Sequence, residues 1–164
     1  MVTMVTRRRN SFPVLLACLL LLTACNKPQE NYQYAVLDVN GIKEAVFQFD
    51  MDSAVSYSTF FSCRYDLGQI QADNVTLFIK AVSPAGFTYR DTVVFPLYRT
   101  TAQAKEDPYT RFNIEQNWNA NIEWTWRVDV VGNEHGLWTV SARPDNYTGL
   151  HSLGFSYSLS GKKR

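Results

Sequence analysis

The stretch NIEWTWRVDVV, residues 121–131, decides the fold class of this chain. Its apolar residues alternate with polar ones without an error: Ile122, Trp124, Trp126, Val128 and Val130. Only a β-strand places successive side chains on opposite faces, so this pattern predicts a strand with one buried face and one wet face. The indole of Trp126 is expected inside the fold.

Two further stretches, 55–66 and 152–160, show nearly the same alternation. In 55–66 the pattern is interrupted only at Thr59 and Phe60, and in 152–160 large apolar residues alternate with serine and glycine. Weaker patterns predict six more strands, over 34–39, 44–51, 74–82, 87–99, 109–116 and 137–142. Tyr and Phe far outnumber Met, which also favours strands over helices.

Turn residues separate these strands. Ser83-Pro84-Ala85-Gly86 predicts a hairpin, and residues 132–136 connect the tryptophan-rich strand to the next one. Pro96 cannot donate a hydrogen bond, so its strand is expected at an edge or at a bulge. About nine strands with such turns predict a single all-β domain over 34–161 that forms an antiparallel β-sandwich. A jelly-roll is one strand topology compatible with this pattern.

The N-terminal region has the layout of a bacterial lipoprotein signal. Arg7-Arg8-Arg9 precede an apolar run over 12–22, which is too short to span a bilayer. Leu22-Thr23-Ala24-Cys25 then resembles a lipobox, so residues 1–24 are predicted to be removed and Cys25 to carry the lipid. The alternative is ordinary cleavage near Ala24 with Cys25 unmodified. Residues 25–33 are expected to form a polar, lipidated tether.

Cysteine content and charge restrict the mature domain further. Cys18 would leave with the signal, so Cys63 remains as a free thiol that the strand pattern directs toward the apolar face. Loss of Arg7, Arg8 and Arg9 lowers the formal net charge from +1 to −2. A weakly acidic domain without a basic stripe gives no electrostatic reason to expect a nucleic-acid partner.

No pattern of catalytic or metal-binding residues can be defended. His135 and His151 have no partner at ligand spacing, and Asp50 with Asp52 offers too few oxygen ligands for calcium. Phosphate loops, nucleophile elbows and paired carboxylates are absent from the sequence. The sequence therefore predicts neither an enzyme nor a cofactor or metal.

Trp118 lies between two strands in Gln116-Asn117-Trp118-Asn119, without apolar neighbours. It is the best candidate for an exposed ring that stacks on a sugar, whereas Trp124 and Trp126 are expected in the core. Asp52-Ser53-Ala54 and Asp91-Thr92-Val93 resemble the acceptor pattern for O-glycans on exported proteins of one bacterial group, so Ser53 and Thr92 are candidate O-glycosylation sites.

Several segments together resemble the gliding-motility lipoprotein GldH family. They are the strand over 57–66, Asn74–Ile79, Pro84-Ala85-Gly86, Arg90–Val93, Gly136–Val140 and Gly149–Phe155, and the similarity covers most of residues 45–160. Residues 100–118 depart from the family pattern. The resemblance implies a noncatalytic envelope lipoprotein, associated with gliding and its coupled protein-secretion machinery, and it transfers no active-site residue.

Two functional hypotheses follow. The first is a structural or assembly lipoprotein, held at the outer membrane through the lipid (palmitate) on Cys25, that docks on other envelope proteins. The second is a surface lipoprotein whose β-sandwich binds glycans. An exposed aromatic strip beside Trp118 would favour glycans, whereas exposed apolar area on a sheet edge would favour a protein partner.

Overall fold

A computed structural model describes residues 31–37, 43–115, 118–146 and 148–160. These residues form nine strands and one short helix, α2. Their bounds are β1 Asn31–Val36, β2 Ala45–Met51, β3 Ser56–Asp66, β4 Asn74–Val82, β5 Thr88–Pro96, α2 Thr101–Ala104, β6 Thr110–Ile114, β7 Asn119–Val131, β8 Gly136–Pro144 and β9 Leu150–Leu159. The fold is thus the predicted all-β one.

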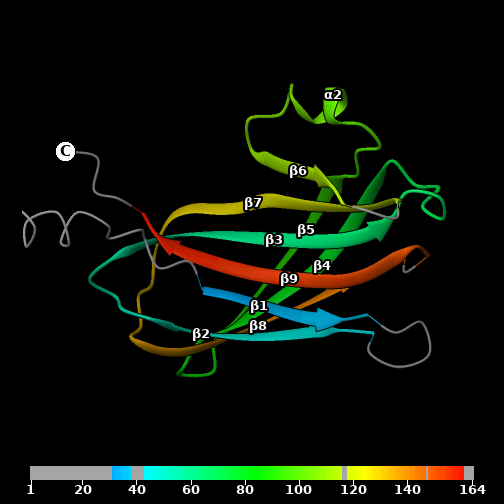
Figure 1. The fold of residues 1–164 in the computed structure, drawn as a ribbon. Coiled ribbons are helices and arrows are strands. Elements are labelled where there is room, and N and C mark those ends of the chain that lie inside the picture. Colours follow the sequence, from blue (N-terminus) through cyan, green and yellow to red (C-terminus); the bar gives the residue numbers. More distant parts are fainter. Residues whose placement is uncertain (1–30, 38–42, 116–117, 147, 161–164) are drawn as a thin grey trace, which may run out of the picture.

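The strands form two antiparallel sheets packed face to face (Figure 1). One sheet has five strands in the order β1-β9-β3-β7-β6, and the other has four in the order β2-β8-β4-β5. The pairs β1·β9, β2·β8, β3·β7 and β4·β5 nest inside one another, as in a long hairpin rolled into a sandwich. This is jelly-roll topology, with β6 as an additional edge strand.

The turn predictions hold in detail. Gly86 has a φ of +90°, which a glycine adopts readily, and its N–H donates to Ser83 O in the β4–β5 hairpin. β5, which ends at Pro96, is the edge strand of the four-stranded sheet. Pro96 O accepts a hydrogen bond from Trp124 Nε1 at 2.8 Å, so this residue joins the two sheets through its carbonyl.

The core lies between the sheets and is rich in aromatic rings. The Phe155 ring packs against Phe47, Phe61 and Trp126, with ring centroids 5.4–6.4 Å apart. Trp124 is 1% exposed and stacks on Phe95 at 4.8 Å. Such rings contribute large buried areas and favour tilted or offset contacts, which fix the spacing between the two sheets.

Two residues assigned to the buried face lie instead in solvent. Val128 is 61% exposed, because the β3–β7 pairing shifts register between Thr59↔Arg127 and Tyr57↔Val130 and Asp129 takes a φ of +53°. This bulge turns Val128 outward and returns Val130 to the inner face. Leu159 is 56% exposed at the last position of β9.

The strand boundaries differ from the predicted ones mainly at the first strand. β1 begins at Asn31, so residues 31–33, predicted as the end of the tether, already belong to the sheet. Residues 1–30, including the predicted signal and Cys25, lie outside the described residues. α2 was not predicted; Thr100 caps it through a capping box with Gln103.

A side chain closes the gap where the edges of the two sheets meet. The side-chain amide of Gln33 on β1 donates to Gln48 O and accepts from Gln48 N at 3.0 Å. It thereby occupies the backbone N–H and C=O of Gln48, which edge strand β2 would otherwise present to water. β1 and β2 lie side by side at the bottom of Figure 1.

Candidate binding face

β1 has an inverted polarity pattern. Its inward positions are Asn31, Gln33 and Ala35, and its outward positions are Tyr32, Tyr34 and Val36, which are 44%, 61% and 70% exposed. Edge strands normally place large apolar side chains toward the core, so this exposed aromatic and aliphatic row makes β1 a candidate contact surface.

This row borders the outer face of the five-stranded sheet, meaning the face turned away from the core. Strand register places Tyr34, Gly154, Ser62, Glu123 and Arg111 in one line across all five strands. A parallel line contains Val36, Ser152, Arg64, Asn121 and Asn113. The outer face therefore has an aromatic edge on β1 and a polar surface over β3, β7 and β6.

Two depressions of about 620 and 290 Å³ mark this face, and both are lined by Tyr34 and Asn121. We call them together the outer groove. The larger one also includes Arg64, Glu115 and His151. The smaller one includes Tyr32, Ser62, Arg111 and Glu123.

Gly154 forms part of the groove floor. A Cβ at this position would lie 2.2 Å from Ser62 Oγ and 2.8 Å from the Tyr34 ring, so only glycine allows the ring this approach. The Tyr32 and Tyr34 rings are nearly parallel, with an interplanar angle of 6° and centroids 6.4 Å apart. The aromatic pair is thus positioned by the sheet rather than by a loop.

Ion pairs supply the charge of the outer groove. Arg64 pairs with Glu115 at 3.0 Å, and Arg111 pairs with Glu123 at 3.3 Å. Arg111 remains 71% exposed, whereas Glu123 is 15% exposed; Arg64 and Glu115 are 48% and 35% exposed. The two arginines are therefore the charged groups of the outer groove that a polar ligand or a partner protein can reach most easily.

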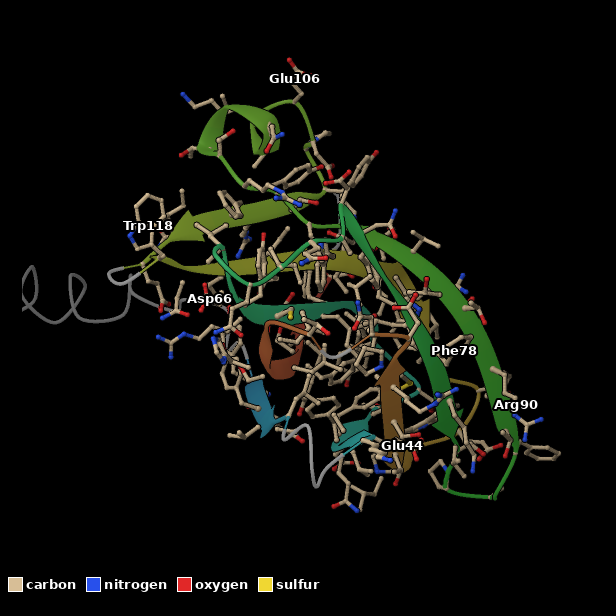
Figure 2. All side chains as sticks on the ribbon, turned by 90° about the vertical axis from the view of Figure 1, so that its right-hand side faces the viewer. Glu44, Asp66, Phe78, Arg90, Glu106 and Trp118 are labelled. Carbon is tan, nitrogen blue, oxygen red and sulfur yellow. The ribbon has the colours of Figure 1, made fainter. Side chains whose placement is uncertain are left out.

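Trp118 is exposed as predicted, at 76%, but it does not line the outer groove. It has a φ of +61°, and its carbonyl accepts from Leu67 N at 2.9 Å. β7, which begins at the neighbouring Asn119, starts at the end of the sandwich opposite the start of β1 (Figure 1). Figure 2 shows Trp118 on the same side of the molecule as Asp66. It makes no ring–ring contact with any residue that the structure describes, so no aromatic strip forms around it.

The two candidate O-glycosylation sites have different environments. Ser53 is exposed in a turn in which Asp52 accepts from Ala54 N at 2.9 Å. Thr92 is exposed in the middle of β5, opposite Phe78. Its neighbour Asp91 is occupied by hydrogen bonds from Trp126 and Arg127. Ser53 is therefore the more accessible acceptor of the two.

Cys63 lies on the apolar face, where the strand pattern placed it, and is 2% exposed. Burial raises the pKa of its thiol to about 12, so the thiol stays protonated at neutral pH. His135 and His151 are both exposed. Within the described ranges, no group of three or more His, Cys, Asp or Glu residues is arranged to hold a metal ion.

The Tyr32–Tyr34 edge is not among the sites expected from sequence, because residues 31–33 are expected there to belong to the tether. Extending the alternation back from Tyr34 to Tyr32 would have identified it. In the described part of the chain, no helix has the length and apolar character needed to span a bilayer. Comparison with protein-family models, curated proteins and solved structures finds no match to this chain.

Proposed function

We propose that this chain is a noncatalytic, lipid-anchored lipoprotein of the cell envelope, held at the outer membrane through Cys25. It serves as a docking component of the gliding and coupled protein-secretion machinery. The signal layout and the resemblance to the GldH family support the anchoring and the process. The inverted polarity of β1 carries the docking role, because it leaves an apolar row exposed beside the outer groove.

The tether length supports a position close to the membrane. β1 begins at Asn31, six positions after Cys25, and an extended chain of that length spans about 20 Å. A lipid on Cys25 would keep the start of β1 within that distance of the bilayer. A neighbouring envelope protein that is itself held at the membrane could then reach the outer groove.

The experiment replaces the native copy in cells with single variants and measures secretion of a cargo protein, together with colony spreading where the organism glides. Tyr34→Glu places a charge on the outer groove, and Phe87→Glu is the matched control. Phe87 is 63% exposed in the β4–β5 turn, away from the groove. We expect Tyr34→Glu to abolish secretion and Phe87→Glu to leave it intact. Normal secretion by Tyr34→Glu at unchanged protein level would contradict the docking role.

Glycan binding is the second candidate, favoured by the parallel Tyr32 and Tyr34 rings beside the charged and amide side chains of the groove. Aromatic faces next to directed polar groups suit a sugar ring, which has apolar faces and a polar rim. An array of soluble oligosaccharides tests it with three proteins: the wild type, Tyr34→Ala and Trp118→Ala. This candidate predicts that only Tyr34→Ala loses binding. Absence of binding by the wild type excludes the candidate for the glycans tested.

A further inference from the structure

A second cavity lies inside the sandwich, separate from the outer groove. It measures about 510 Å³, which is within the range of roughly 300–1,000 Å³ typical of ligand pockets. Both sheets contribute to its wall: Thr59, Trp126 and Val130 from one, and Ile79, Ala81 and Trp138 from the other. Most of this wall is apolar, and its polar members are Thr59, Arg90, Asp91, Arg127 and Asn133.

The cavity exists because the two sheets do not fill the space between them at this point. On the five-stranded sheet the β7 bulge turns Val128 outward, and the small side chain of Thr59 faces inward with 2% exposure. On the opposite sheet the inward residue is Ala81. Moving hydrocarbon from water onto an apolar wall is favourable, so a hydrocarbon chain would be stabilised in this cavity.

Polar groups lie at the rim rather than in the interior. Asp91 points inward from edge strand β5, where Arg127 pairs with it at 2.6 Å and Trp126 Nε1 donates to it at 3.1 Å. Both carboxylate oxygens of Asp91 therefore accept hydrogen bonds, since the second oxygen accepts from Thr92 N. Arg127 uses one terminal nitrogen for Asp91, and its side chain remains 57% exposed, which leaves N–H donors for an anion at the rim.

An apolar interior with a cationic group at its opening fits a molecule that has a hydrocarbon chain and an anionic head. We propose that this cavity binds a single-chain anionic amphiphile of the fatty-acid class, with the chain between the sheets and the carboxylate at Arg127. The cavity is at the level of the first residues of β1, since Asn31 pairs with Tyr157 and Tyr157 with Thr59. If Cys25 is lipidated as proposed above, this end of the domain lies within about 20 Å of the bilayer.

The binding test uses the chain from Asn26 to Arg164, because both sheets and the whole described core come from residues 31–160. The probe is dodecanoate, and calorimetry gives its affinity and stoichiometry. We expect one site that binds the probe. Ala81→Val and Ala81→Leu fill the cavity in two steps and are expected to weaken binding progressively. Ala102→Leu, the same change on the exposed surface of α2, should leave it unchanged.

The head group is tested by comparing dodecanoate with dodecanol. Arg127→Gln removes the cation and leaves Asp91 uncompensated at the rim, so dodecanoate affinity should fall about tenfold or more while dodecanol affinity stays the same. Equal losses for both probes would overturn the assignment of the head group.

The cavity assignment itself fails if the wild type binds no dodecanoate, or if Ala81→Leu, folded by circular dichroism, binds it as well as the wild type. None of these measurements depends on acylation of Cys25, so they separate this proposal from the proposed function.

Discussion

The indole N–H of Trp126 donates to the carboxylate of Asp91 at 3.1 Å, and the two residues belong to opposite sheets. Arg127, next to Trp126 on β7, pairs with the same carboxylate oxygen. An acidic residue that points inward from an edge strand discourages pairing with another chain. Here it also joins β5 to β7 across the open side of the sandwich.

This arrangement predicts unequal effects for two tryptophans. Trp126 is half-buried against Phe61 and Phe155, so Trp126→Ala should lower the free energy of unfolding by about 3 kcal/mol. Trp118→Ala is the matched control, since that ring is exposed, and should change it by no more than about 0.5 kcal/mol. Urea unfolding measures both. Equal losses would contradict the assigned packing of Trp126.

The ion pair changes what is expected of Arg127. From alternation alone, Arg127 faces water and its replacement should have almost no effect. Because it pairs with Asp91 at 2.6 Å while remaining 57% exposed, Arg127→Ala should lower the free energy of unfolding by about 1 kcal/mol. The same urea series decides this, and a loss below the experimental error would mean that solvent screens the pair.

Stability should fall in acid partly through Asp91. Its partial burial would raise the pKa, but hydrogen bonds from Trp126 and Arg127 and the charge of Arg127 outweigh this and hold the pKa below its usual value of 3.8. A carboxylate with a lowered folded-state pKa stabilises the fold above the unfolded value and loses this contribution as the pH falls through the folded one. Burial would raise the pKa of Asp107 too, but hydrogen bonds from Thr110, Tyr109 and Tyr98 lower it, so Asp107 acts in the same direction.

Asp91→Asn isolates the contribution of Asp91. Thermal unfolding between neutral pH and strong acid should show a stability difference between wild type and variant that is largest near neutral pH and shrinks below 3.8. A difference that is constant with pH would show that the negative charge of Asp91 contributes nothing to the stability of the fold.

Cys63 should be unreactive in the folded protein. Cys63 is 2% exposed, and burial raises the pKa of its thiol to about 12. At neutral pH the thiol is therefore neither accessible to a reagent nor deprotonated. In the chain from Asn26 onward it is the only cysteine, so maleimide labelling should follow unfolding alone. Rapid labelling without denaturant would contradict its position in the core.

The O-glycan hypothesis predicts extra mass on the native protein. Ser53 is expected to carry the modification, because its turn leaves the hydroxyl accessible. Ser53→Ala should reduce the intact mass by one glycan, whereas Thr92→Ala should not. A native mass equal to that of the acylated polypeptide alone would remove the hypothesis for both residues.

The strands could be predicted from sequence because their apolar and polar side chains alternate between the core and water. Residues 74–82 have the predicted bounds of β4, and the edge position of β5 follows from Pro96. The exposure of Val128 could not be predicted, because the bulge at Asp129 depends on pairing with β3 and leaves no local pattern.

The binding face was harder to predict than the fold. Trp118 was singled out by its polar neighbours, and its exposure is confirmed, yet the outer groove is built from residues on five different strands. Their proximity depends on strand order, which alternation does not encode. The interior cavity likewise has a wall that comes from both sheets, with Thr59 on one and Ala81 on the other.

The measurement that tests the central claim most directly is metabolic labelling with a clickable fatty acid, applied to the wild type, Cys25→Ala and Cys63→Ala. Lipid attachment at Cys25 predicts label on the wild type and on Cys63→Ala, with the protein in the membrane fraction. It predicts no label on Cys25→Ala. Label that persists on Cys25→Ala, or a wild type without label, would contradict a lipoprotein anchored through this cysteine.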